Sequence, residues 1–180
     1  MILQGKLVKL RGIEYEDLIA RLRWLNDPEI TRFFTNLGAM PLTEKELSHW
    51  YECLGERQHQ EVHFAVDTVT SEHIGGAQLK AIDWRNRSAE LGLFIGNTQY
   101  WGQGLGTEIV QLLINYGFYT LNLNRIWLRV DIENTGAIRC YQKAGLSEEG
   151  VFREEVYSQG HYHDSVIMSI LRREIEDGLS

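Results

Sequence analysis

The chain has 180 residues, of which 43% are hydrophobic and 24% are charged, as in an ordinary globular protein with one proper core. A formal net charge of −7 argues against a nucleic-acid-binding protein, which usually presents a basic face. An acidic balance suits a cationic or neutral small substrate, although it also serves solubility alone.

The first third of the chain is predicted to form one strand and then helices. Asp27 before Pro28 is a helix-start signal, and Thr43 with Glu46 three residues later forms a capping box. Alternation in KLVKLRG indicates a strand, whereas leucines at helical spacing indicate a helix before Asn26. We expect a strand at 6–12 and helices at 14–25, 28–34 and 43–54.

The remainder of the chain reads as strands interrupted by two helices. Three strand-like runs joined by polar turns come first, and each later helix is followed by strand patterns. We expect strands at 62–68, 73–84, 89–96, 125–131, 146–157 and 161–171, with helices near 105–118 and 134–145. Asn134 is the predicted N-cap of the second helix and Gly145 its stop. This order of elements predicts a mixed α/β sheet.

The cysteines and the apolar runs of the sequence indicate in which cellular compartment the protein works. Cys53 and Cys140 form no CxxC pair, so neither a disulfide framework nor a zinc cluster is predicted. The start of the chain lacks the apolar core of a signal peptide, and no apolar run approaches the roughly 20 residues that cross a bilayer. We therefore expect a cytoplasmic protein with no membrane partner, and a single domain over residues 1–180 because no linker or repeat divides it.

The stretch WGQGLGT, residues 101–107, places three alternating glycines directly before an apolar-periodic helix. A helix N-terminus offers free N–H groups and partial positive charge, and glycines let an anion approach the backbone. The spacing fits neither GxGxxG nor GxxxxGK[ST], which disfavours a dinucleotide or nucleoside-triphosphate loop. The stretch therefore predicts a pyrophosphate cradle, unless the glycines only let a helix and a strand pack closely.

Two motifs together resemble the GNAT superfamily of N-acetyltransferases. Residues 101–106 fill the acetyl-CoA loop pattern [Q/R]xxGx[G/A], with Trp101 where glutamine or arginine is usual. A second pattern, typical of the branch with ribosomal-protein and polyamine acetyltransferases, is N-x-x-[S/A]-x-x-x-Y-x-K-x-G-[F/L]. It is matched by Asn134, Ala137, Tyr141, Lys143, Gly145 and Leu146. Ala137 stands where serine is frequent.

The resemblance implies a mostly antiparallel sheet with flanking helices, in which two central parallel strands splay apart. The pantetheine arm of acetyl-CoA then lies in the gap like an added strand, and the glycine loop holds the pyrophosphate. The residues that the resemblance assigns to acetyl-CoA are Phe94, Ile95, Gly96, Trp101, Gly102, Gln103, Gly104, Leu105, Gly106, Thr107 and Asn134.

The resemblance also assigns the proton transfers. Glu90 is the expected base for the acceptor amine, directly or through water; alternatively it is a surface glutamate paired with Arg85 or Arg87. Tyr141 is the expected acid for the departing thiolate, unless it only packs in the core. No nucleophile with a suitable partner suggests a covalent acetyl-enzyme, and Cys140 should point elsewhere on its helix.

Two further features have alternative interpretations. The HYH run, His161 and His163, places two imidazoles on one strand face; with no third ligand in view, we read a structural pair and predict no metal site. Residues 30–46 are the expected lid over the acceptor, and Phe33 and Phe34 its apolar lining or simple core.

The acceptor stays open at this stage. We expect direct acetyl transfer to a primary amine, either a protein N-terminus or a small molecule such as a polyamine, amino sugar or aminoglycoside. The run TNLGAMP replaces the acidic residues that follow RFF in spermidine-acetylating relatives, which weakens the polyamine reading. A non-catalytic acyl-CoA-binding module is the remaining alternative, and a homodimer is compatible with the sequence.

Overall fold

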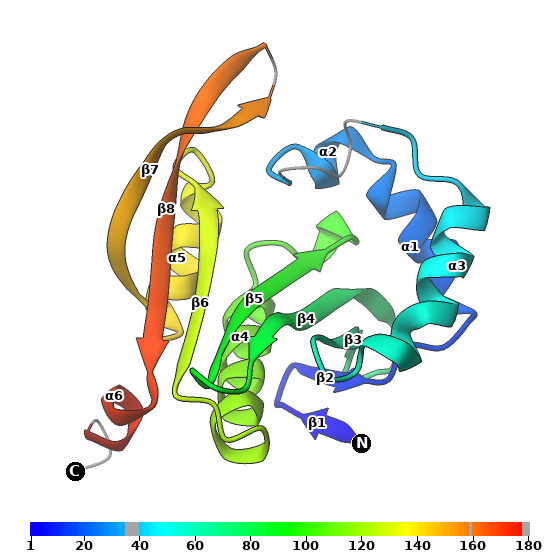
Figure 1. Cartoon of the computed structure of the whole chain (residues 1–180). Helices are drawn as coiled ribbons and strands as arrows, with labels where there is room; N and C mark the ends of the chain where they lie inside the picture. Colours follow the sequence, from blue (N-terminus) through cyan, green and yellow to red (C-terminus); the bar gives the residue numbers. More distant parts are fainter. Residues whose placement is uncertain (35–39, 159, 178–180) are drawn as a thin grey trace.

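Eight strands form one mixed sheet in the order β1-β2-β3-β4-β5-β6-β8-β7 (Figure 1). The computed structural model describes residues 1–34, 40–158 and 160–177. The strands are β1 (Ile2–Gln4), β2 (Val8–Arg11), β3 (Val62–Thr68), β4 (His73–Asp83), β5 (Ser88–Ile95), β6 (Arg125–Asp131), β7 (Ser147–Ser158) and β8 (His161–Leu171). Among these strands only β5 and β6 pair in parallel.

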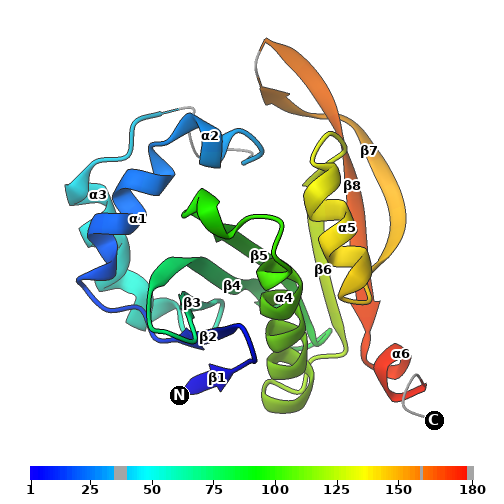
Figure 2. The same cartoon turned by 180° about the vertical axis from the view of Figure 1, so that it is seen from behind.

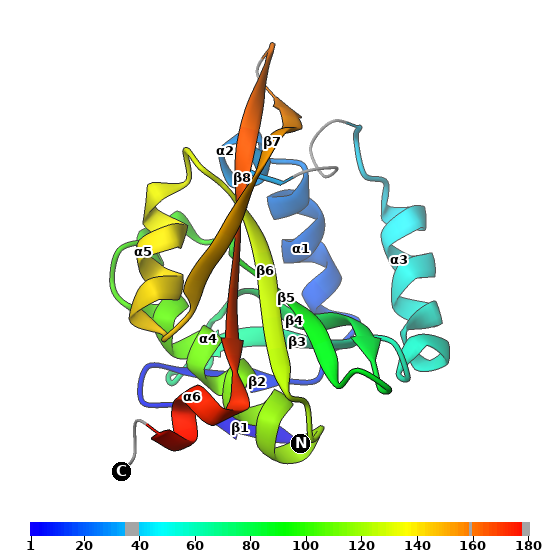
Figure 3. The ribbon, with the colours of Figure 1, turned by 60° about the vertical axis from the view of Figure 1, so that its left-hand side comes forward.

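Helices cover both faces of the sheet, as Figures 1 and 2 show from opposite sides. The helices are α1 (Asp17–Leu25), α2 (Pro28–Thr31), α3 (Glu44–Glu52), α4 (Leu105–Asn115), α5 (Thr135–Lys143) and α6 (Arg172–Asp177). Helices α1 and α3 lie on one face, and α4 and α5 lie side by side on the other (Figure 3). The mixed, mostly antiparallel α/β sheet with flanking helices that the sequence predicted is present.

The core lies between the sheet and α4. Ile109 and Leu113, one helical turn apart on α4, are fully buried together with Leu79 of β4 and Ile126 of β6. Strand β6 alternates buried and more exposed residues, as expected for a strand with one face against helices. This packing holds β5 and β6 in place under the N-terminus of α4.

Several predicted elements agree closely with the structure. The Thr43–Glu46 capping box is present, and the Asp27 side chain accepts a hydrogen bond from the Glu29 N–H. The strands predicted at 62–68, 125–131 and 161–171 have the bounds of β3, β6 and β8. No helix of the described residues is long and apolar enough to span a bilayer.

The sequence did not predict β1, α6 or the position of β8 between β6 and β7. Strand β1 has only three residues, and a distant contact holds its turn. The Glu108 carboxylate of α4 accepts hydrogen bonds from three consecutive N–H groups at Lys6, Leu7 and Val8, at 2.7, 2.7 and 2.9 Å. A contact across about a hundred residues leaves no local pattern.

Candidate active site

A cleft of about 560 Å³ opens where β5 and β6 separate. The two strands pair only from Ser88 to Glu90 against Arg125 to Trp127, and beyond that point they diverge (Figure 1). The cleft is lined by the end of β5, the glycine loop, the first turn of α4, helix α5 and residues around α2. The splayed parallel strands expected from the sequence are therefore present.

The glycine loop presents bare backbone to this cleft. Gly102 and Gly104 have φ of +74° and +85°, a region that favours glycine, and a Cβ at either would meet no protein atom within 4 Å. Gly104 is the N-cap of α4, an 11-residue helix whose first N–H groups point out of its N-terminus. The Trp101 indole donates to the Ile95 carbonyl at 2.8 Å and fixes the loop to β5. Gln103 instead turns its side chain back to the Gln99 carbonyl.

Gly106 has a different reason to be glycine. It lies in the first turn of α4, and a Cβ there would come within 3.1 Å of the Cys140 sulfur on α5. The Thr107 hydroxyl donates to the same sulfur at 3.6 Å. Gly102 and Gly104 leave open space, as a pyrophosphate cradle would require, whereas Gly106 permits close packing of α4 against α5. Cys140 points toward α4 but lines the cleft as well, and burial raises the pKa of its thiol.

Tyr141 lines the cleft from α5, the helix that Asn134 caps by accepting a hydrogen bond from the Ala137 N–H at 3.2 Å. The Tyr141 hydroxyl has no hydrogen-bond partner within the described part of the chain. Burial raises the pKa of this phenol well above its usual value, with a smaller contribution from Cys140. The phenol therefore keeps its proton at neutral pH and is free to donate it.

Arg139 and Lys143, one turn apart on α5, also line the cleft and were not predicted as site residues. Each adds a positive charge on the wall that shares the cleft with the glycine loop. The Lys143 position lies inside the sequence motif, and Arg139 precedes it by four residues, which is helical spacing. That i, i+4 pair of cations is the signal that would have identified them.

The main chain of β5 requires one correction. The Gly96 N–H donates to the Ile74 carbonyl of β4 at 2.8 Å, so it is not available to a ligand in the gap. Backbone groups alternate in direction along an antiparallel pair, so those of Phe94 face β4 as well, and those of Leu93 and Ile95 face the gap. Position 96 has no room for a side chain, because a Cβ there would lie 2.1 Å from the Trp24 ring.

Glu90 lies at the last residue of β5 that pairs with β6, opposite Trp127. Its side chain is 15% exposed and its Oε1 atom is 3.2 Å from the Lys80 Nζ, so its ion-pair partner is Lys80 rather than Arg85 or Arg87. The alternation of β5 places Glu90 on the same sheet face as Phe94. Glu90 therefore lies where β5 and β6 begin to separate, and it does not line the cleft itself.

Phe33 and Phe34, in the segment after α2, line the cleft. Glu29 of α2 and Arg32 at its end line it as well. The Phe34 ring lies 6.2 Å from that of Phe94 in an edge-to-face arrangement. The Arg32 guanidinium lies over the Phe33 ring, with its Cζ atom 4.6 Å from the ring centroid. Residues 35–39 of the expected lid lie outside the described residues.

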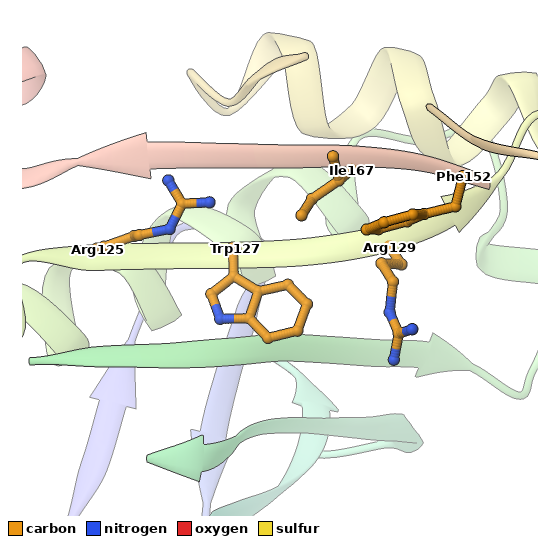
Figure 4. A pocket seen from close by; sticks show the side chains of 5 residues that line it. All are labelled: Arg125, Trp127, Arg129, Phe152 and Ile167. Carbon is orange, nitrogen blue, oxygen red and sulfur yellow. The ribbon is translucent and has the colours of Figure 1, made fainter. Parts of the chain in front are cut away.

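A second, smaller hollow of about 280 Å³ lies on the face of β6 opposite α4 (Figure 4). It is lined by Arg125, Trp127, Arg129, Phe152 and Ile167. Both arginines are engaged, with Glu149 and Glu155 of β7 respectively. The hollow is separate from the cleft, and it offers no unpaired charge to a ligand.

The model of the acetyltransferase (GNAT) domain matches residues 8–147 of this chain. The chain belongs to the GNAT acetyltransferase family. It is an N-acetyltransferase that uses acetyl-CoA as co-substrate.

Relatives of this GNAT chain include acetyltransferases with different names. An uncharacterized N-acetyltransferase of Bacillus licheniformis is 32% identical over 169 residues, 92% of this chain and 93% of that protein. The spermidine N(1)-acetyltransferase of Escherichia coli is 34% identical over 167 residues, 93% of this chain and 87% of that enzyme. A crystal structure of the Vibrio cholerae spermidine N-acetyltransferase with CoA and spermine superposes with a TM-score of 0.85 at 28% identity, covering 94% and 98% of the two chains.

Proposed function

We propose that this chain acetylates a primary amine of a small, polyamine-like cation. The observation that carries the proposal is the cleft between the separated strands β5 and β6, where an unpartnered phenol and the N-terminus of α4 share one space. Glu29 adds negative charge along the same cleft, and it suits an acceptor that arrives as a cation.

The residues of the cleft fit acetyl-CoA. The N–H groups from Gly102 to Thr107, with Arg139 and Lys143, would hold the diphosphate, since donors and positive charge meet there. The outward-facing main chain of Leu93 and the Ile95 N–H would bind the pantetheine arm, with Asn134 near it from α5; the Ile95 carbonyl already accepts from Trp101. Bound acetyl-CoA supplies an acetyl group activated as a thioester.

Glu90 and Tyr141 divide the proton transfers. An alkyl amine has a reference pKa near 10.4, so removing its proton at pH 7 costs about 5 kcal/mol. Glu90 takes that proton, through water because it stands outside the cleft proper, and the neutral amine nitrogen attacks the acetyl carbon. As the carbon–sulfur bond breaks, Tyr141 donates its phenolic proton to the sulfur, and the second proton that the acylated nitrogen loses returns through water to the Tyr141 phenolate.

The wider similarity favours the polyamine class over a protein N-terminus. The Escherichia coli spermidine enzyme aligns with 93% of this chain, whereas a Bacillus subtilis protein named as a candidate ribosomal N-acetyltransferase aligns with 57%, at 35% identity. The acidic residues replaced by TNLGAMP argue in the other direction. Acetylation of a peptide N-terminus is therefore the second candidate.

A thiol-release assay with acetyl-CoA separates these acceptors. The panel is spermidine, spermine, amino sugars, an aminoglycoside and peptides with free N-termini, each with Tyr141→Phe as the blank. Turnover with spermidine at least 10-fold above peptides and amino sugars supports the proposal. Turnover with peptides alone, or CoA binding without turnover on any acceptor, contradicts it.

We also propose the cytoplasm as the compartment of this enzyme, consistent with the two free cysteines. The expected homodimer stays a prediction, which analytical ultracentrifugation of the purified chain would test.

A further inference from the structure

The two histidines of the HYH run meet two carboxylates from a distant part of the chain. His161 and His163 lie two residues apart on β8 and therefore share one face of the strand. Asp131 ends β6, where it pairs with Ser165 of β8, and Glu133 follows in the loop before α5. The sequence offered no third ligand for the histidine pair, and the fold provides two.

The four side chains converge on a small volume. The His163 Nδ1 is 3.3 Å from the Glu133 Oε2 and 3.6 Å from the Asp131 Oδ2. The His161 Nε2 is 3.9 Å from the Glu133 Oε1, and the two imidazole centroids are 4.0 Å apart. One ligand atom from each of Glu133, His161 and His163 lies within 4.8 Å of the others. Ligands of a tetrahedral zinc ion, with bonds near 2.0 Å, stand ~3.4 Å apart, so small side-chain rotations suffice.

Two buried polar atoms at the centre of this cluster have no hydrogen-bond partner. They are the His163 Nδ1 and the Asp131 Oδ2, on side chains that are only 3% and 1% exposed. Their other polar atoms are engaged: the Asp131 Oδ1 accepts from the Glu133 N–H at 2.8 Å, and the His163 Nε2 contacts Ser158 at 3.2 Å. Unpartnered buried groups are rare in folded proteins, and these two point at each other.

A comparable cluster of carboxylates and a histidine elsewhere in the protein contains an arginine, and the cluster around His163 does not. Asp17, Asp67 and His73 also come together, but the Arg11 guanidinium donates to both carboxylates at 2.7 to 3.0 Å. In the described chain no lysine or arginine lies within ion-pairing distance of Asp131 or Glu133. Two carboxylates packed against imidazoles favour a bound cation, and within the described residues no lysine or arginine takes that place as Arg11 does in the other cluster.

We propose that Asp131, Glu133, His161 and His163 form a binding site for a divalent transition-metal ion. Two imidazole nitrogens and two carboxylate groups match the ligands that Zn²⁺ accepts. Glu133 and His161 are more than half exposed, which leaves an entry path for the ion. The ion takes no part in acetyl transfer.

The site connects β8 to the start of α5. Glu133 directly precedes Asn134, the N-cap of α5, and both residues line the acetyl-CoA cleft. An ion shared by β8 and this loop fixes the position of the N-cap. We therefore expect the metal to stabilise the fold and to lower the KM for acetyl-CoA more than it changes kcat.

Calorimetric titration of the metal-free full chain with zinc chloride tests the site without acetyl-CoA. We expect one ion per chain with a Kd in the micromolar range. His161→Asn and Glu133→Gln each change an exposed side chain, so both variants should fold, and each should weaken binding at least 10-fold. His49→Gln is the matched control, because its imidazole lies 3.8 Å from the Cys53 sulfur and offers an alternative zinc pair.

A second readout uses Co²⁺ in place of Zn²⁺. Bound with mixed nitrogen and oxygen ligands, it should give visible absorption bands that His163→Asn abolishes, while circular dichroism verifies that the variant is folded. The proposal is overturned if zinc does not bind, or if binding survives in His161→Asn and Glu133→Gln. It is equally overturned if binding is lost only in His49→Gln.

Discussion

Replacing Gly104 by alanine tests whether the bare backbone ahead of α4 binds acetyl-CoA. Gly104 has φ +85°, and an added Cβ would meet no protein atom within 4 Å, so the new methyl group enters the space reserved for the ligand. A left-handed conformation costs alanine about 1–2 kcal/mol, and the stiffer unfolded chain returns about 0.4–1 kcal/mol. The net loss of stability is therefore about 1 kcal/mol, or a Tm lower by about 2–4 °C.

The effect on the ligand should be larger than the effect on stability. A methyl group that moves one phosphate oxygen off a backbone N–H removes a hydrogen bond to a charged group, which contributes about 1.5–3 kcal/mol. At 1.4 kcal/mol per factor of ten, the Kd for acetyl-CoA should rise about 10- to 150-fold. Isothermal titration of the free coenzyme and of acetyl-CoA measures this change.

Gly160→Ala is the matched control for backbone strain. Gly160 has φ +89°, its Cβ would also meet nothing within 4 Å, and it lies outside the cleft. The two variants should lose a similar Tm in calorimetry, but only Gly104→Ala should lose affinity. If Gly104→Ala binds acetyl-CoA within twofold of the wild type, or if Gly160→Ala weakens binding equally, the pyrophosphate does not lie against the glycine loop.

Three other predictions follow from the site and the fold. Tyr141→Phe should lower kcat about 100-fold with little change in acetyl-CoA affinity; because the pKa of Tyr141 is raised, the wild-type phenol stays protonated as pH rises, and steady-state kcat should show no loss from it below about pH 10. Glu90→Gln should cause a rate deficit that shrinks between about pH 7 and pH 10, as more acceptor amine is already neutral; a deficit independent of pH would assign Glu90 a positioning role. Glu108→Ala removes the acceptor of three N–H groups and should lower the free energy of unfolding in urea by about 2 kcal/mol, with Glu108→Gln in between; an unchanged midpoint would contradict that anchor.

The local sequence determined much of this protein. The capping box at Thr43, the N-cap at Asn134, the extents of β3, β6 and β8 and the glycine loop before α4 all follow from residues a few positions apart. Caps and hydrophobic periodicity act over one or two turns, so the pattern alone carries them. The GNAT fold and the use of acetyl-CoA followed from two such motifs.

Only the tertiary structure decided which groups meet across long distances. It turned the backbone of Leu93 and Ile95 toward the gap, brought the Cys140 sulfur against Gly106, and paired Glu90 with Lys80. The placement of β8 beside β6 also joined two histidines to carboxylates about thirty residues earlier in the chain. Strand order and register are set by packing of the whole sheet, and no short stretch of the sequence contains that information.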